Sequence, residues 1–197
     1  MNKKVAKALC DANVIKFGSF TLSSGRTSPV YVDIRILPST PSAFQTIADE
    51  LAKAVKGIDA SIVAGAETAG IPLAAAIALK NKMPMIYVRK RPKQYGTISM
   101  IEGVLEQNDK VVLVDDMATD GRSKIIFIDG IRAAGGKVED AIIVLDREQG
   151  AKETMKQMGV NLHSLITLRE ILEYMKEEGT IDDSQYDKVM DYLGGGE

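Results

Sequence analysis

The chain opens with a short amphipathic segment followed by two apolar stretches. Between Lys3 and Ala12 apolar side chains recur at spacings of three and four residues, which places them on one helical face. The stretches Phe17–Leu22 and Val30–Ile36 have the composition of strands and are separated by Ser23–Pro29, whose Gly, Ser and Pro residues are typical of a loop. This pattern predicts a helix and then a β-hairpin or an open pair of strands.

A second helix is predicted from Pro41 to Val55. Thr40 is its expected cap, and Pro41 occupies the first helical position, where a missing N–H is tolerated. The apolar residues that would face inward are Phe44, Ile47, Ala48, Leu51, Ala54 and Val55.

Further along, strands and helices alternate. The predicted strands are Ala60–Ala64, Met85–Val88, Lys110–Val114, Val138–Leu145 and one near Leu162–Thr167. The predicted helices are Gly70–Leu79, Gly121–Ala134, one running from beyond Gly150 to Met158, and two short ones ending at Leu193. Alternation of this kind predicts an α/β fold with a mostly parallel sheet and helices on both faces.

One stretch interrupts the alternation. Residues Arg89–Gln107 are charged and contain glycine, so we expect a mobile excursion that returns as a β-hairpin around Ile98–Leu105. No internal repeat and no second domain is apparent. We therefore expect a single domain over 1–197, divided into an N-terminal segment 1–40, an α/β core 41–167 and C-terminal helices 168–197.

Composition and charge narrow the function classes. The chain has 45% hydrophobic and 26% charged residues, and its 25 Lys and Arg against 27 Asp and Glu give a net charge of -2. Such a surface has no overall field for a nucleic-acid backbone. The lone Cys10 excludes an internal disulfide framework, and no segment resembles a signal peptide or a membrane span. We expect a cytoplasmic protein that binds neither nucleic acid nor membrane.

An acidic pair, Asp115 and Asp116, follows the apolar run 111–114. In an open parallel sheet ligands bind outside the carboxyl ends of the strands, where this pair is expected. Adjacent carboxylates at such a place are costly unless they have a function. A turn with a helix cap would use the same residue types, so the pair alone favours neither interpretation.

Two other kinds of site, a triphosphatase phosphate loop and an aspartate metal cluster, can be compared with the residues of this region. The segment 65–70 has the glycine spacing of a triphosphatase phosphate loop, but Ile71 and Pro72 stand where Lys and Ser or Thr are needed. A prenyltransferase-like cluster of the acidic pair with Asp120 would lie inside a helix. Here the β-branched run before the pair and Gly121 after it predict a strand, a loop and then a helix.

A third interpretation is a ribose 5-phosphate site. The acidic pair would accept hydrogen bonds from two ribose hydroxyls, and the backbone N–H groups of 118–123 would bind the phosphate at the start of the next helix. Thr119 and Ser123 add hydroxyl donors, and Gly121 allows a close approach of the backbone.

The run Val-Val-Leu-Val-Asp-Asp-Met-Ala-Thr-Asp-Gly-Arg-Ser, residues 111–123, resembles the diphosphoribose-binding motif of type I phosphoribosyltransferases. The resemblance implies that fold, with a small N-terminal hood, and transfer of a phosphoribosyl group from 5-phospho-α-D-ribose 1-diphosphate, hereafter the donor, to a base. The implied donor contacts are Asp115, Asp116, Met117, Ala118, Thr119, Asp120, Gly121, Arg122 and Ser123. Family members commonly have Thr, Ser or Ala at the position of Asp120. A further negative charge beside a phosphate is unfavourable, so we expect the Asp120 side chain either to turn away or to pair with a cation such as Arg122.

A diphosphate leaving group needs positive charge. Cations cluster just past a predicted strand end, at Arg89, Lys90, Arg91 and Lys93. A basic loop alone is usually a solvated surface, but its coexistence with the acidic motif favours a diphosphate site. A loop that closes would exclude water from a cationic transition state. The amides of 66–70 offer a second diphosphate contact.

The acceptor is indicated by Arg147, at the end of another predicted strand. A guanidinium can pair with a planar carboxylate through two hydrogen bonds, although a surface salt bridge is the ordinary alternative. The segment 17–35 resembles the hood of the orotate phosphoribosyltransferases, and the order of motifs agrees with theirs from 17 to 150.

This closer resemblance implies diphosphate contacts from Arg89, Lys90, Lys93 and Tyr95, and orotate contacts from Thr119 and Arg147. It implies catalytic roles for Lys93, Asp115 and Asp116, with Mg²⁺ bound mainly through the donor and no metal site formed by the protein itself. It also implies a homodimer in which the basic loop is shared. Two departures are Ser23 and Ala69, where many or some members have Lys. A purine phosphoribosyltransferase and a non-catalytic donor sensor remain alternatives, and His163 is expected to lie away from the site.

Overall fold

The protein, described by a computed structural model for residues 1–21, 25, 27–92 and 99–194, is built on a six-stranded sheet of order β5-β4-β3-β6-β7-β8. Its strands are β3 (Ile62–Ala66), β4 (Met85–Val88), β5 (Ile101–Glu102), β6 (Lys110–Ala118), β7 (Lys137–Asp146) and β8 (Asn161–Thr167). All neighbouring pairs are parallel except β4 and β5. The mostly parallel sheet predicted from the alternation is confirmed.

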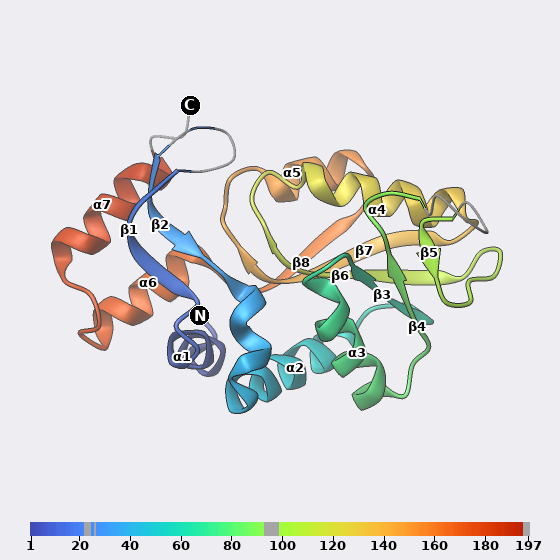
Figure 1. The fold of residues 1–197 in the computed structure, drawn as a ribbon, viewed down its shortest axis with the longest axis horizontal. Helices are drawn as coiled ribbons and strands as arrows, with labels where there is room; N and C mark the ends of the chain where they lie inside the picture. Colours follow the sequence, from blue (N-terminus) through green and yellow to red (C-terminus); the bar gives the residue numbers. More distant parts are fainter. Residues whose placement is uncertain (22–24, 26, 93–98, 195–197) are drawn as a thin grey trace.

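Helices cover both faces of this sheet. In Figure 1, α2 (Pro41–Val55) and α3 (Gly70–Asn81) lie on one face, and α4 (Arg122–Ala133) and α5 (Ala151–Gln157) lie on the other. Alternate residues of β6 supply both cores: Val112 and Val114 belong to the cluster with α2 and α3, whereas Val111 and Leu113 belong to the cluster with α4. A strand buried on both sides is therefore apolar throughout, because successive side chains point to opposite faces.

The N-terminal and C-terminal segments meet at one end of the sheet. They comprise α1 (Lys3–Asp11), the antiparallel pair β1 (Ile15–Thr21) and β2 (Thr27–Val32), the 3-10 helix η1 (Ile34–Ser39), α6 (Leu168–Glu177) and α7 (Asp183–Gly194). α6 packs against α1, and α7 packs against β2. Cys10 packs against the same core, and burial raises the pKa of its thiol to about 11. The division of the chain at residues 40 and 167 into an N-terminal segment, a core and C-terminal helices remains a prediction.

Several predicted bounds differ from the structure by one or two residues, and three predicted elements differ more. The strand predicted to Ile36 ends at Val32, because the Asp33 side chain accepts a hydrogen bond from the Arg35 N–H and starts η1. The segment predicted to return as a β-hairpin around 98–105 contains only the short strand β5 among its described residues, and β5 pairs antiparallel with β4. Residues 93–98 lie outside the described part of the chain.

The third difference concerns the acidic pair. β6 was predicted to end at Val114 but continues to Ala118, since it pairs with β7 as far as Asp146. Asp115 and Asp116 therefore lie in the strand and not in a turn.

Among the described helices, none has the length and apolar character needed to cross a bilayer.

Candidate active site

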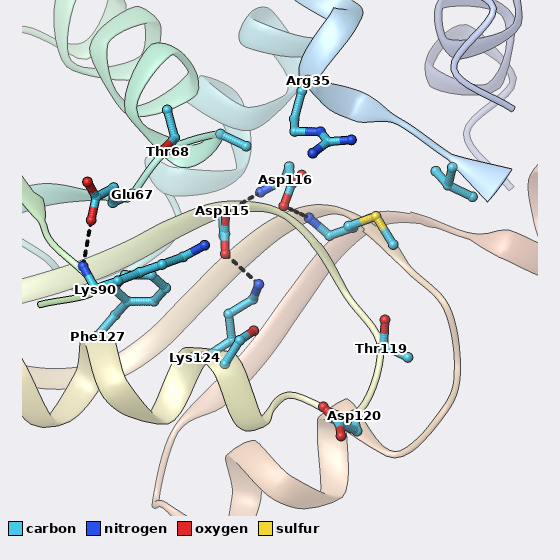
Figure 2. A pocket seen from close by; sticks show the side chains of 14 residues that line it. Arg35, Glu67, Thr68, Lys90, Asp115, Asp116, Thr119, Asp120, Lys124 and Phe127 are labelled. Carbon is cyan, nitrogen blue, oxygen red and sulfur yellow. Dashed lines mark hydrogen bonds and ion pairs between the residues drawn. The ribbon is translucent and has the colours of Figure 1, made fainter. Parts of the chain in front are cut away.

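A cavity of about 660 Å³ opens at the carboxyl ends of β3, β4 and β6. The chain runs from β3 through α3 to β4 on one side, and later returns to β6 on the other side of β3. Helices α3 and α4 thus leave opposite faces at this point, which is where open α/β sheets bind ligands. Figure 2 shows the wall, to which the sheet, α4 and the η1 region of the hood contribute side chains.

The acidic pair forms the floor of the cavity. Asp115 is 7% exposed; its Oδ1 accepts a hydrogen bond of 2.9 Å from the Asp116 N–H, and its Oδ2 is paired with the Lys124 ammonium. The Asp116 Oδ1 accepts a hydrogen bond of 2.7 Å from the Met117 N–H. Burial and then the charge of Asp115 raise the pKa of Asp116 to about 6, although Lys124 opposes this rise.

The loop after β6 leads directly into α4. Gly121, with a φ of 78°, precedes the helix, and a Cβ on it would lie 3.2 Å from the Ala151 backbone at the start of α5. Only glycine suits that conformation and that approach. Thr119 and Ser123 line the cavity beside the N-terminus of α4, where free amides and the helix dipole favour an anion.

Asp120, which departs from the family pattern, is paired with Arg122. Its Oδ1 accepts a hydrogen bond of 3.1 Å from the Arg122 N–H, and its Oδ2 lies 3.5 Å from the Arg122 Nε. Both side chains are exposed, so solvent weakens this ion pair. The cation expected beside Asp120 is present, but one amide of the loop is occupied by the Asp120 carboxylate.

The loop between β3 and α3 forms the opposite wall. The Glu67 Oε2 accepts a hydrogen bond of 2.7 Å from the Lys90 N–H, which ties this loop to the end of β4. A Cβ on Gly70 would lie 2.2 Å from the Val114 carbonyl oxygen, so α3 begins in direct contact with β6. Thr68 and Ala69 are held next to the acidic pair by this contact.

The structure brings most of the predicted donor contacts around one cavity. Lys90, Asp115, Asp116, Met117, Thr119, Asp120 and Ser123 line the cavity. Arg89 lies outside its lining, where its Nη1 is 3.6 Å from the Glu102 Oε1. Ala118, Gly121 and Arg122 also lie outside the lining. Lys93 and Tyr95 fall outside the described residues, as does Ser23.

Arg147 lies beside the motif but not in the cavity wall. Its backbone N–H donates a hydrogen bond of 3.0 Å to the Ala118 carbonyl, and the residue is 7% exposed. Burial lowers the pKa of its guanidinium, while Tyr192 of α7 opposes this. Within the described part of the chain, its Nε and Nη2 have no hydrogen-bond partner. Buried donors of this kind are rare in proteins without a functional reason.

Four residues of the wall, Val32, Arg35, Lys124 and Phe127, were not assigned from the sequence. Lys124 and Phe127 come from the first turns of α4. Their spacing of three residues places both on one helical face, on the side of the loop that precedes the helix. Arg35 comes from the hood, where its Nε donates to the Asp33 Oδ1 at 2.7 Å and its Nη2 to the Tyr31 hydroxyl at 2.7 Å. Asp33 raises the pKa of Arg35. The helical face was a usable signal for Lys124, whereas the position of Arg35 depends on how the hood folds over the sheet.

His163 lies on β8, and its Nε2 is 2.7 Å from the Asp140 Oδ1. Neither residue lines the cavity, in agreement with the expected place of this histidine away from the site.

Comparison with known proteins identifies the family. No protein-family model matches the chain. The orotate phosphoribosyltransferase of Sulfolobus acidocaldarius is 37% identical over 187 residues, covering 95% of this chain and 94% of that protein.

Solved structures agree with the sequence comparison. The orotate phosphoribosyltransferase of Aeropyrum pernix is 39% identical with a TM-score of 0.79, covering 90% of this chain and 99% of that one. The UMP synthase of Leishmania donovani is 32% identical with a TM-score of 0.89, covering 98% of this chain and 42% of that longer one. The predicted phosphoribosyltransferase fold is confirmed, and the chain belongs to the orotate phosphoribosyltransferase family of pentosyltransferases.

Proposed function

We propose that this protein transfers the phosphoribosyl group of the donor to orotate, which yields orotidine 5'-phosphate and diphosphate for pyrimidine nucleotide synthesis. The observation that carries the proposal is the single cavity that joins the acidic pair of β6, the N-terminus of α4 and the loop before α3. Family membership supports the same activity.

Each part of the donor has a matching part of the cavity. The ribose hydroxyls would donate to Asp115 and Asp116, and the 5-phosphate would lie against Thr119, Ser123 and the first amides of α4. The diphosphate would extend toward the loop 67–69 and Lys90, with Lys93 and Tyr95 as further contacts. This arrangement separates the negative groups of the donor from the carboxylates of the floor.

The reaction breaks the bond between the anomeric carbon and diphosphate and forms a bond from that carbon to the orotate ring nitrogen. The electron pair leaves with the diphosphate, where Lys90 and Lys93 would stabilise the departing charge. Positive charge develops on the ribose ring above Asp115 and Asp116, whose carboxylates favour it. The ring nitrogen gives up its proton to the departing diphosphate or to water as it becomes bonded to carbon.

Magnesium would be held mainly by the donor. Within the described part of the chain, no group of three or more His, Cys, Asp or Glu side chains could hold a metal ion. A hard cation that keeps several waters and binds diphosphate oxygens fits such a site, and it supplies neutralising charge to the leaving group.

Orotate would be recognised by Arg147 with Thr119. Two buried nitrogen atoms of the guanidinium have no hydrogen-bond partner among the described residues, which suits the planar carboxylate that distinguishes orotate from uracil. The adjacent Ala118 carbonyl ties the Arg147 backbone to the donor motif.

Replacement of Arg147 by Gln is expected to lower kcat/KM for orotate about 100-fold, because a buried charge-assisted pair is lost. The KM for the donor should change less than about threefold, since the donor contacts are elsewhere. Steady-state kinetics with each substrate varied in turn measure both. Arg169→Gln is the control, because Arg169 is exposed on α6 and lies 3.8 Å from the Glu148 carboxylate. An unchanged KM for orotate would contradict the assignment.

Diphosphate release tests the activity itself. Protein, Mg²⁺ and donor are mixed with orotate, uracil, adenine or hypoxanthine, and only orotate should respond. A response to a purine would favour a purine phosphoribosyltransferase. Donor binding without release for any base would favour a donor-sensing regulator.

A homodimer with shared sites is part of the proposal, as is a cytoplasmic location. Lys93→Ala and Asp116→Asn proteins, each nearly inactive alone, should regain about a quarter of native activity when mixed and allowed to exchange subunits. About half of the dimers are then heterodimers, and one of the two sites in each heterodimer is intact. Native mass spectrometry of the two differently tagged variants follows the exchange. Activity that stays absent after proven exchange would show that the loop acts within its own subunit.

A further inference from the structure

Lys124 is a buried cation that the proposed reaction does not yet use. It lies in the first turn of α4, is 4% exposed, and pairs through its ammonium with the Asp115 Oδ2. Its side chain also lines the cavity, where Figure 2 shows it directed at the acidic pair from the helix side.

The position of Lys124 is unfavourable for a lysine in two respects. Removing an ammonium from water costs several kcal/mol unless it is paired. The first turn of a helix also has positive dipole potential, which disfavours a cation. An apolar residue would fill this site at lower cost, so the ion pair with Asp115 needs a reason beyond packing.

The charges around the acidic pair supply that reason. Both oxygens of Asp115 are held, one by Lys124 and the other by the Asp116 N–H at 2.9 Å. The Asp116 Oδ1, in contrast, accepts a hydrogen bond from the Met117 N–H, the Asp115 side chain is a further hydrogen-bond partner that raises the pKa of Asp116, and the Asp116 carboxylate borders the open cavity.

Other charged groups come from the surrounding elements. Arg35 from the hood, Glu67 from the loop before α3, Lys90 from the end of β4 and Asp120 from the loop before α4 line the same cavity as Asp116. Arg35 is engaged with Asp33, and the Asp120 carboxylate with Arg122. Lys124 is therefore the cation that is built into the floor itself.

We propose that Lys124 is a positioning residue for donor binding: it neutralises Asp115, so that Asp116 is ionised beside it and both carboxylates can accept the ribose hydroxyls. It also removes one negative charge from a site that must admit phosphate groups. The inference rests on the proposed function and adds a residue to its donor site. The opposing effect of Lys124 on the raised pKa of Asp116 agrees with this role.

Lys124→Met tests the proposal, since Met keeps the length and apolar stem but removes the charge. The KM for the donor should rise at least about tenfold, while the KM for orotate changes less than about threefold. The acidic limb of the pH profile of kcat/KM for the donor should move up by about one unit, because Asp116 loses a neighbouring cation. Lys124→Arg should restore the native limb.

Lys110→Met is the matched control. Lys110 lies at the other end of β6, is exposed, and pairs with Asp59 away from the cavity. It should leave both KM values and the pH profile unchanged. A purely structural role for Lys124 would lower the stability of Lys124→Met without moving the acidic limb, and that result would overturn the proposal.

If Lys124→Met does not fold, Lys124→Gln keeps a polar group that can donate to the Asp115 Oδ2 and removes only the charge. Donor affinity is then measured by calorimetry with Mg²⁺ and without orotate. Native-like affinity in Lys124→Gln, with an unshifted acidic limb, would overturn the proposal. Failure of the native protein to bind the donor would instead reject the proposed function.

Discussion

An Asp116→Asn protein should lose most of its turnover and yet be more stable than the native protein. The neutral amide cannot accept from the ribose hydroxyl as a carboxylate does or stabilise the positive ribose ring, so kcat/KM for the donor should fall about 100- to 1000-fold. The native carboxylate is held in the cavity floor beside Asp115, at a cost to folding that the amide does not have.

The sign of the stability change follows from the pKa of Asp116, which is about 6 in the folded protein against the ordinary 3.8. Above the folded pKa the carboxylate is ionised in both states, and its ionisation destabilises the fold. As the pH falls through the folded pKa, the folded state takes up the proton first, and this cost is lost by the time the pH reaches the unfolded value. At pH 8 the variant should gain about 1–3 kcal/mol, and near pH 4 the difference should vanish. Urea denaturation at both pH values measures it.

The neighbouring Asp115→Asn variant is the contrast. It leaves the Lys124 ammonium buried without its carboxylate, so it should lose about 3–5 kcal/mol of stability. Opposite stability changes for two adjacent carboxylates would be difficult to explain by general damage to the site. Equal losses in both variants would contradict the charge arrangement described for the floor.

Gly70→Ala should destabilise the protein by about 3 kcal/mol and lower kcat at least about 100-fold. The added methyl would lie 2.2 Å from the Val114 carbonyl oxygen and 3.2 Å from the Asp115 Cα, and both are backbone atoms of β6. Because neither can rotate away, α3 must shift from the sheet. The loop 67–69 would then move relative to the acidic pair, and the donor could no longer contact both.

Thermal unfolding and steady-state kinetics measure the two effects of Gly70→Ala. Gly57→Ala is the control, since its methyl would meet only the Ala54 carbonyl oxygen at an ordinary 3.4 Å. It should leave activity unchanged. A Gly70→Ala protein with native kinetics would show that α3 and β6 tolerate separation at this point.

Helices and strands with a strong local pattern were predictable from the sequence. The second helix was predicted at its observed bounds, Pro41–Val55, since a proline start and an inward face both mark it. The strand Met85–Val88 was also predicted at its observed bounds. β6 was predicted too short, because two acidic residues follow its apolar run, and the strand conformation of the last residues comes from pairing with β7.

The site divides in the same way. Asp115, Asp116, Thr119 and Ser123 stand in one short run, so their chemistry is visible in the sequence, and the order of the motifs indicates the family. Lys124 adjoins that run, but its burial and its pairing with Asp115 depend on the direction in which α4 leaves the sheet. Arg35 reaches the cavity only through the fold of the hood.

The sequence by itself determined the parallel α/β sheet, the donor motif and the orotate phosphoribosyltransferase family, because periodicity and contiguous motifs are local properties of a chain. Only the tertiary structure decided the raised pKa of Asp116 in the floor and the burial of Arg147. These depend on solvent exclusion and on distances between segments far apart in sequence. The donor motif thus shows which groups are present, and the packing of α3, α4 and β6 determines how they are charged.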